Sequence, residues 1–271
     1  MYFLPTVVNI ETVNRFCDAR CPMCTIKFLP DFKNKTTDDL SFRGFSRKAG
    51  IMKEDIFEKI ALKFKKHTKN ITALNLHGCG EPLLDKGLSA KIKYAKKVGF
   101  TNIGFSSNCN ILNRDKTKQL LESGLNCLIA SIDGLTKEVQ EEIRPRTNFE
   151  RIYNNVKYFI DYRNRYDFPC RILVRMVKQQ ANKYQWVEYE NYWNNLLNQK
   201  KGDKVLFMDV HNTGGKVDDF DKKKVDDYDE KIKSYNYSMR SESDNSYLKK
   251  ITNVNPNNQN NYIKVNDAEK A

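Results

Sequence analysis

Short apolar segments alternate with amphipathic ones from residue 7 to residue 212, and few folds are compatible with that order. No apolar segment is longer than eight residues, and all are rich in β-branched or other apolar side chains, as strands buried on both faces are. The six segments read TVVNIETV, ITALNLHG, TNIGFSS, NCLIASID, CRILVRMV and KVLFMDVH. Such β-then-α units predict an α/β fold with a parallel sheet and right-handed crossovers.

The segments between these strands have the spacing of amphipathic helices. Asn113 is placed to cap one helix at its start, while Gly99 and Gly124 are placed to end two of them. Periodicity does not say whether the sheet closes fully, closes partly or stays open. In each case functional groups are expected at the carboxyl ends of the strands. The five helical segments are 53–68, 88–99, 113–124, 148–160 and 182–197, the last with Trp186, Tyr189 and Trp193 facing the core.

Length and charge limit the class of protein. The chain has 271 residues, enough for one large domain or a domain with an appendage. It has neither a run of eighteen apolar residues nor the pattern of a signal peptide, so we expect no membrane span and a cytoplasmic location, where clustered cysteines indicate metal or redox sites. The net charge of +13 is compatible with nucleic acid or an acidic partner. Without a compact basic block interleaved with aromatics, we favour a lysine-rich solvated surface over nucleic-acid binding.

Two segments depart from the alternation. Residues 27–50 form a long basic loop, which is typical of a lid or a substrate contact but also of tolerated packing. After Lys216 the chain is polar and rich in asparagine. We therefore expect a folded domain over residues 1–216 and a weakly ordered tail over residues 217–271.

Three cysteines stand together in CDARCPMC, at positions 17, 21 and 24. Structural zinc takes four ligands, and the histidines of this chain lack the spacing of a catalytic zinc site. A ferredoxin cluster also takes four cysteines. Three thiolates fit a [4Fe–4S] cluster that keeps one iron free for another ligand. The alternative is a chance grouping, or a redox pair with a spare thiol.

The pattern C-x3-C-x2-C after a first strand resembles the radical S-adenosylmethionine (SAM) superfamily. The resemblance implies a partial (β/α)6 barrel in which Cys17, Cys21 and Cys24 hold a [4Fe–4S] cluster whose free iron binds SAM. It implies reductive cleavage of SAM to a 5′-deoxyadenosyl radical that abstracts hydrogen from a substrate. Met23 replaces the family's usual aromatic residue, which packs near the adenine, and a methionine can fill that space.

The second strand ends in HGCGEPLLD, which resembles the family's GGEP motif, whose backbone contacts the SAM amino group. The resemblance assigns Gly78, Gly80 and Glu81 to cofactor binding, and glycines allow the close approach of a ligand to the backbone. Cys79 stands where the motif has its first glycine. It is either a small residue in a glycine position, which we favour, or a further thiol ligand.

The next two strand ends carry further matches. FSSNCN resembles the family's TNG, so Ser107 and Asn108 are expected to bind ribose hydroxyls, with Cys109 in a glycine position. ASIDG resembles S-x-D-G, so Ser131 and Asp133 are expected to bind or orient the ligand, although an aspartate before glycine also suits a turn.

The stretch EEIRPRTNFERIYNN resembles a family segment whose arginine pairs with the SAM carboxylate. We assign that role to Arg144, with Arg146 as the alternative, because arginine binds carboxylates through two parallel bonds. Cys127 and Cys170 are expected to be small buried residues away from the site.

The last two units resemble the branch of the superfamily that carries a SPASM extension, in which HN-x-GG closes the barrel. The resemblance covers residues 7 to about 216, and no cysteine follows Cys170 to form that extension. The expected function is a radical SAM enzyme acting on a peptide or small molecule, with an electron donor such as flavodoxin or ferredoxin. One alternative is a protein that binds iron–sulfur and SAM without catalysis, as a truncated SPASM-type enzyme would. The other, a zinc-dependent nucleic-acid module, is disfavoured by its incomplete ligand set.

Overall fold

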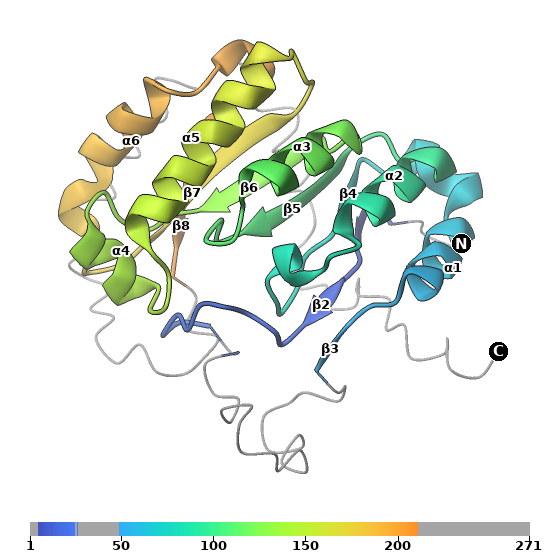
Figure 1. Ribbon diagram of the computed structural model, residues 1–271, viewed down its shortest axis with the longest axis horizontal. Helices are drawn as coiled ribbons and strands as arrows, with labels where there is room; N and C mark the ends of the chain where they lie inside the picture. Colours follow the sequence, from blue (N-terminus) through green and yellow to red (C-terminus); the bar gives the residue numbers. More distant parts are fainter. Residues whose placement is uncertain (1–4, 25, 27–48, 211–271) are drawn as a thin grey trace. The chain divides into compact units, whose positions relative to one another are not determined.

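The computed structural model describes residues 5–24, 26 and 49–210, and its centre is one parallel sheet (Figure 1). The sheet has six strands in the order β1-β4-β5-β6-β7-β8, and every neighbouring pair is parallel. All six predicted strands are therefore confirmed. They are β1 (Val7–Asn9), β4 (Ala73–Asn75), β5 (Ile103–Ser107), β6 (Cys127–Ser131), β7 (Arg171–Lys178) and β8 (Lys204–Asp209).

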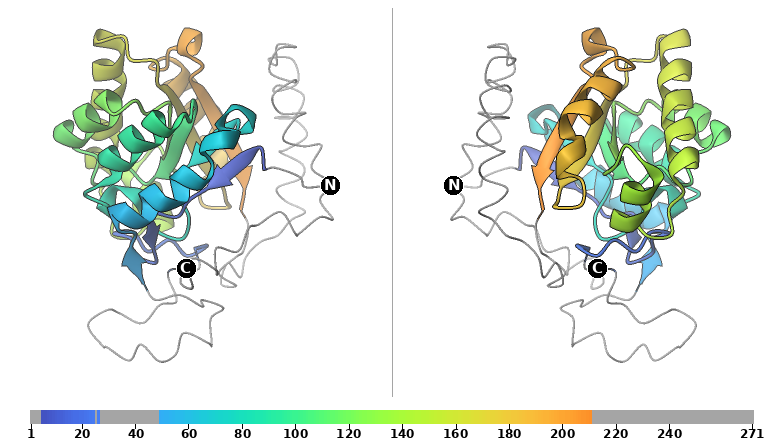
Figure 2. Two further views of the ribbon diagram at one scale, coloured as in Figure 1. Left: turned by 90° about the vertical axis from the view of Figure 1, so that its right-hand side faces the viewer. Right: turned by 90° about the vertical axis from the view of Figure 1, so that its left-hand side faces the viewer.

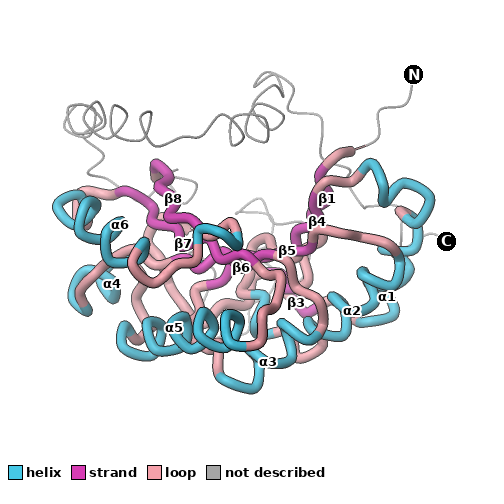
Figure 3. Tube along the Cα trace, turned by 90° about the horizontal axis from the view of Figure 1, so that it is seen from above, coloured by secondary structure: helices cyan, strands magenta, loops and turns pink. Residues whose placement is uncertain are grey.

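The sheet is curved and open. Strands β1 and β8 are its two edges, so in the part of the chain that the structure describes the barrel is partial, as the family resemblance implied. Figure 3 shows the strands as an arc with the helices along its convex side. In β7 every second side chain is buried against the helices, whereas the alternate ones, on the concave side, are only partly buried. Strand β7 is thus fully covered on one face only, whereas β5 and β6 have buried residues on both faces.

Five helices lie within or close to the predicted segments: α1 (Glu54–Lys63), α2 (Leu88–Val98), α3 (Arg114–Glu122), α5 (Phe149–Arg165) and α6 (Trp186–Asn194). Asn113 caps α3 by accepting the amide N–H of Lys116, and Gly99 ends α2 with a positive φ of 116°. On α6 the side chains of Trp186, Tyr189 and Trp193 are buried, which confirms their predicted place in the core. Figure 2 shows α6 and α5 from either end of the arc.

Some elements were not predicted. Helix α4 (Lys137–Ile143) follows β6, and its 7 residues are too few for a clear helical periodicity. Strands β2 (Val13–Asn14) and β3 (Gly50–Ile51) pair antiparallel in a separate two-stranded sheet. The described ranges also contain short 3₁₀ helices: η3 (Lys65–Asn70), η4 (Pro82–Leu84), η5 (Lys183–Gln185) and η6 (Gln199–Lys201).

A buried ion pair lies at the amino-terminal end of β8. Arg163 of α5 donates two hydrogen bonds to the carboxylate of Asp203, at 2.9 and 2.5 Å, and both side chains are fully enclosed. Asp203 also accepts the amide N–H groups of Ile172 and Asn198. The polar groups at this end of the sheet are therefore engaged in structural contacts. The carboxyl ends of the strands are the place to look for a functional site.

The tail 217–271, residues 211–215 of the HN-x-GG match and the loop 27–48 lie outside the described residues. Within the described ranges, no helix combines the length and apolarity needed to cross a membrane.

Candidate cofactor site

The loop that carries the three cysteines is bound to the carboxyl ends of the strands by backbone hydrogen bonds. The amide N–H of Glu81, beyond β4, donates to the carbonyl of Phe16 at 2.8 Å, and that of Arg15 donates to the carbonyl of Cys79. On its other side the N–H of Arg20 donates to Pro145 O at 3.0 Å, just after α4. The cysteine loop thus joins the ends of elements that are far apart in sequence.

Hydrogen-bond donors surround two of the thiols. The amide N–H of Ala19 lies 3.4 Å from Cys17 Sγ, and Asn108 Nδ2 lies 3.8 Å from the same sulfur. Arg144 Nη1 lies 3.7 Å from Cys21 Sγ. Such donors stabilise a thiolate over a thiol. The donor set therefore suits a metal centre held by sulfur.

Burial works against the charged form of these thiols. It raises the pKa of Cys17 to about 12, with a further contribution from the negative charge of Glu81. It also raises the pKa of Cys21, and the Arg144 guanidinium opposes that change. Burial therefore favours the protonated form of the Cys17 and Cys21 thiols. A metal centre would displace these protons as it binds, since thiolate is the ligand form.

The arrangement differs from a site for one metal ion. Among the described residues, no three His, Cys, Asp or Glu side chains stand together as the ligands of a single ion do. Cluster cysteines each bind a different iron, so their sulfurs lie farther apart than those around one zinc. Three thiols on one loop, with N–H donors beside two of them, fit a cluster better than a zinc ion.

Asp18 is a site residue that the sequence did not reveal. Its carboxylate accepts from Asn108 Nδ2 at 2.7 Å and from Asn110 Nδ2 at 2.8 Å. Both asparagines follow β5 and are buried. The residue after Cys17 is thereby held against the end of the third strand of the sheet. No sequence motif identified Asp18 as a site residue, because an aspartate in a loop is usually a turn residue.

Glu81 is buried and bonded inside the protein. Its carboxylate accepts from Ser107 Oγ at 2.7 Å, from the N–H of Asn108 at 2.9 Å and from the N–H of Leu83 at 3.1 Å. Burial raises the pKa of this carboxyl to about 7, although the three hydrogen bonds oppose the change. The Ser107 hydroxyl also accepts the N–H of Cys109 at 2.9 Å. Glu81 and Ser107 thus join the ends of β4 and β5.

Close contacts surround the two glycines of the GGEP-like turn. A Cβ on Gly80 would overlap the carbonyl of Val13, and one on Gly78 would lie 2.6 Å from Glu11 Oε1. Cys79, between them, is exposed. Cys109, the other cysteine in a family glycine position, is fully buried and adopts a positive φ of 59°. That conformation favours glycine and explains the family preference at this position.

Arg144 reaches the cysteine loop, whereas Arg146 is exposed at the surface with a φ of 72°. Arg144 Nε lies 2.7 Å from Asp133 Oδ2, and both side chains are almost completely enclosed. Asp133 Oδ1 accepts the N–H of Val177 at 2.7 Å, which joins β6 to β7. The structure thus brings Asp133, Arg144 and Cys21 together.

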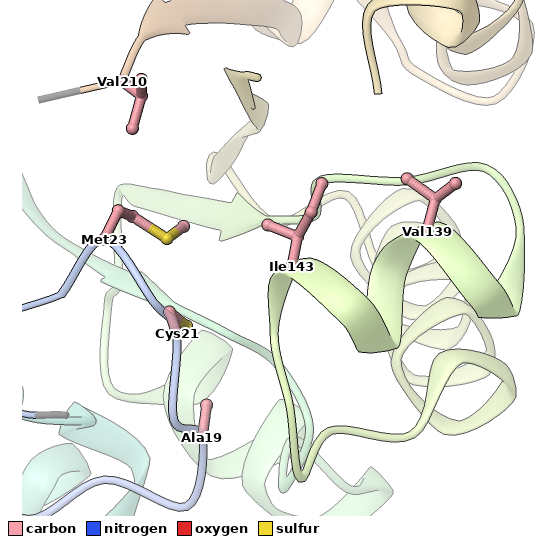
Figure 4. Packing of buried hydrophobic residues seen from close by; sticks show 6 residues of the cluster. All are labelled: Ala19, Cys21, Met23, Val139, Ile143 and Val210. Atoms are coloured by element: carbon pink, nitrogen blue, oxygen red, sulfur yellow. The ribbon is translucent and has the colours of Figure 1, made fainter. Parts of the chain in front are cut away.

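Met23 is buried in a small apolar cluster beside the cysteines. Figure 4 shows it with Val210, just after β8, and with Ile143 of α4. Ser131 lies further along the sheet, where its hydroxyl accepts from Arg175 Nη2 at 2.7 Å. Cys127 begins β6 and Cys170 immediately precedes β7, so both lie at the amino-terminal ends of strands, away from the cysteine loop. Both are buried, as predicted.

Comparisons with known proteins give one consistent family. The model of the "Radical SAM superfamily" matches residues 12–174. Two relatives come from Methanocaldococcus jannaschii: 7,8-dihydro-6-hydroxymethylpterin dimethyltransferase, 28% identical over 136 residues, and probable GTP 3′,8-cyclase, 31% identical over 105 residues. These alignments cover 49% and 38% of this chain, and 23% and 35% of the relatives.

Solved structures share the fold at low sequence identity. Streptococcus suis SuiB bound to precursor peptide SuiA superposes with a TM-score of 0.61 at 16% identity, over 87% of this chain and 47% of that one. The structure of anSMEcpe with AdoMet and Cp18Cys peptide gives 0.53 at 14% identity, over 77% of this chain and 52% of that one. The chain therefore matches about half the length of these proteins.

Proposed function

The chain belongs to the radical SAM superfamily, and we propose that it is an enzyme that holds a [4Fe–4S] cluster on Cys17, Cys21 and Cys24. The cofactors of this superfamily are that cluster and SAM. Together they supply one-electron cleavage of SAM and abstraction of hydrogen from a substrate. The observation that carries the assignment is the loop of three cysteines, fixed at the carboxyl ends of the strands with N–H donors on its sulfurs.

The protein's own residues would position these groups. Arg144 is proposed to bind the carboxylate of SAM, because its guanidinium lies beside Cys21 and Asp133 fixes its orientation. Gly78, Gly80 and Glu81 are proposed to shape the turn whose backbone meets the SAM amino group. Ser107, Asn108 and Asp133 are proposed to support the ribose and its neighbours, and Met23 the adenine, whereas Ser131, which the resemblance assigns to the cofactor, has its hydroxyl bonded to Arg175.

We propose a peptide or small molecule as the substrate, with flavodoxin or ferredoxin as the electron donor. The peptide is supported by the SuiB and anSMEcpe structures, each of which holds a bound peptide. A second candidate is a protein that binds the cluster and SAM without catalysis.

The test is anaerobic reconstitution with iron and sulfide, followed by an assay for 5′-deoxyadenosine from SAM and dithionite. We expect four irons per chain, a brown chromophore and product. Replacing any one of the three cysteines by alanine should abolish the chromophore, whereas Cys127→Ala should retain it. A full cluster without product would support the non-catalytic candidate, and a cluster that survives loss of one cysteine would refute the ligand assignment.

A further inference from the structure

A guanidinium on the inner face of the sheet is held mainly by two hydroxyl groups, and its Nη1 also lies 3.8 Å from Met208 Sδ. Arg175 Nη2 donates to Ser131 Oγ at 2.7 Å and to Ser106 Oγ at 2.8 Å. The two hydroxyls lie 3.1 Å from one another. Strands β5, β6 and β7 each supply one member of this cluster, which we call the Arg175 cluster.

The Arg175 cluster faces the concave side of the arc. Ile172, Val174 and Met176 of β7 are fully buried, so they point toward the helices. Arg175 stands between two of them in sequence and is only partly buried, so it points the other way. Figure 3 shows the helices on the convex side, and the guanidinium therefore lies on the concave face of the sheet.

The positive charge of the cluster has no ion-pair partner among the described residues, although Asp133 lies near enough to stabilise it weakly. Arg144 and Arg163, the two buried arginines described above, each have a carboxylate partner, Asp133 and Asp203. No carboxylate in the described ranges stands at ion-pair distance from Arg175, and its buried Nε–H has no acceptor there. Burial and the nearby Arg144 lower the pKa of this guanidinium. A partly buried cation without a counter-charge is unfavourable, and an anion would remove that penalty.

His77 adds a neutral donor beside the cluster. Its Nδ1 accepts the N–H of Ser106 at 3.3 Å, so the neutral ring carries its proton on Nε2. Burial and the charge of Arg175 lower the pKa of His77 to about 4. The ring is therefore neutral at physiological pH and does not repel the guanidinium. Cation, hydroxyls and imidazole together form a set suited to an anion's oxygens.

The cluster lies next to the proposed cofactor site. Ser131 is in register with Arg175, and two residues later Asp133 pairs with Arg144. Two residues of a strand span about 7 Å. A molecule bound at the Arg175 cluster would thus lie two residues closer to the amino-terminal ends of the strands than the Asp133–Arg144 pair.

We propose that Arg175, Ser106 and Ser131 bind an anionic group of the substrate, a carboxylate or a phosphate, inside the partial barrel. This inference rests on the proposed function, which identifies that space as the substrate site. It assigns Arg175 a role in substrate selection. The enzyme would take an acidic substrate and hold its negative group beside the proposed cofactor site.

The test compares the reconstituted full chain with its Arg175→Met variant, and uses the exposed Arg151→Met as the matched control. Succinate and inorganic phosphate serve as probes in calorimetric titrations at constant ionic strength, and SAM is titrated separately. We expect Arg175→Met to weaken binding of at least one probe about tenfold or more, while SAM affinity and iron content stay unchanged. The stronger of the two probes identifies a carboxylate or a phosphate.

A structural role predicts different results. A methionine in place of Arg175 would leave Ser106 and Ser131 bonded to one another, so we expect the variant's melting temperature without probe to equal or exceed that of the parent chain. A lower melting temperature with unchanged probe binding would overturn the inference. So would equal loss of SAM and probe affinity, which would assign Arg175 to SAM. If Arg175→Met does not fold, Arg175→Lys keeps the charge and should bind the same probe more weakly.

The two proposals can fail separately. Iron content and 5′-deoxyadenosine are measured on the same preparations as probe binding. Anion binding that depends on Arg175 in a chain that does not cleave SAM would leave this site standing without the proposed reaction. SAM cleavage without such binding would overturn only the Arg175 site.

Discussion

Two asparagines after β5 hold the carboxylate beside the first cysteine. Asn108 and Asn110 both donate to Asp18, and Asn108 also approaches Cys17 Sγ. A loop bearing thiols that must converge on one cofactor needs such restraints, because its own backbone lacks a helix or strand to fix it. We therefore infer that Asp18 positions the cysteine loop.

We expect Asp18→Ala to reduce the iron retained after reconstitution several-fold and to destabilise the chain by about 1–3 kcal/mol, since two buried amides lose an acceptor. Iron content after gel filtration and chemical denaturation check this. Asp161→Asn, exposed on α5, is the control. Full iron retention in the Asp18 variant would show that the backbone bonds of the loop suffice.

His77 makes stability depend on pH. Its pKa is lowered from 6.5 to about 4 by burial and by Arg175, so the unfolded chain binds the proton more tightly. Above pH 6.5 the ring is neutral in both states and its contribution is fully present. That contribution is lost as the pH falls through 6.5 toward 4, by roughly 1–3 kcal/mol.

The comparison is with His77→Gln, which cannot titrate. Denaturation curves at pH 7, 6 and 5 should show a steeper loss of stability for the parent chain than for the variant. Parallel losses in the two proteins would mean that the carboxylates, not His77, determine the acid sensitivity.

At the scale of elements, the turn after β4 packs against the strand that precedes the cysteine loop. The glycine at position 80 permits this contact, because a Cβ there would overlap the carbonyl of Val13 in β2. We expect Gly80→Ala to destabilise the chain by about 1–3 kcal/mol and to lower iron retention.

The matched control is Gly50→Ala in β3, where an added Cβ has nothing within 4 Å. It should leave both stability and iron retention nearly unchanged. Thermal melts and iron analysis of the two variants test this prediction. Equal melting temperatures and equal iron contents would show that the turn can move away from β2 without loss of stability or iron binding.

At the scale of the whole molecule, the six strands and their covering helices all lie within residues 5–210. We therefore expect a chain that ends at residue 216 to keep the thermal stability, cluster binding and SAM cleavage of the full chain. Melting curves and the 5′-deoxyadenosine assay test this prediction. An insoluble product would show that residues 217–271 contribute to folding.

Much of the architecture follows from local patterns. The six strands and five of the helices were read from short apolar runs and helical spacing, and caps such as Asn113 and Gly99 stand where local chemistry favours them. Helix α4 was missed because two turns are too short for periodicity, and β2–β3 because two-residue strands carry no alternation. The thiols of the cysteine loop were identifiable because their spacing is local.

The sequence by itself determined the positions of the six strands along the chain, the approximate positions of five helices and the grouping of three cysteines, since each depends on neighbours within a few residues. Only the tertiary structure decided that Asp18 is held by Asn108 and Asn110, that Glu81 accepts from Ser107, and that Arg144 rather than Arg146 faces Cys21. The surroundings of Arg175 likewise could not be predicted from the sequence. Whether a cation has a counter-charge depends on which strands are adjacent in space, and that is a property of the folded sheet.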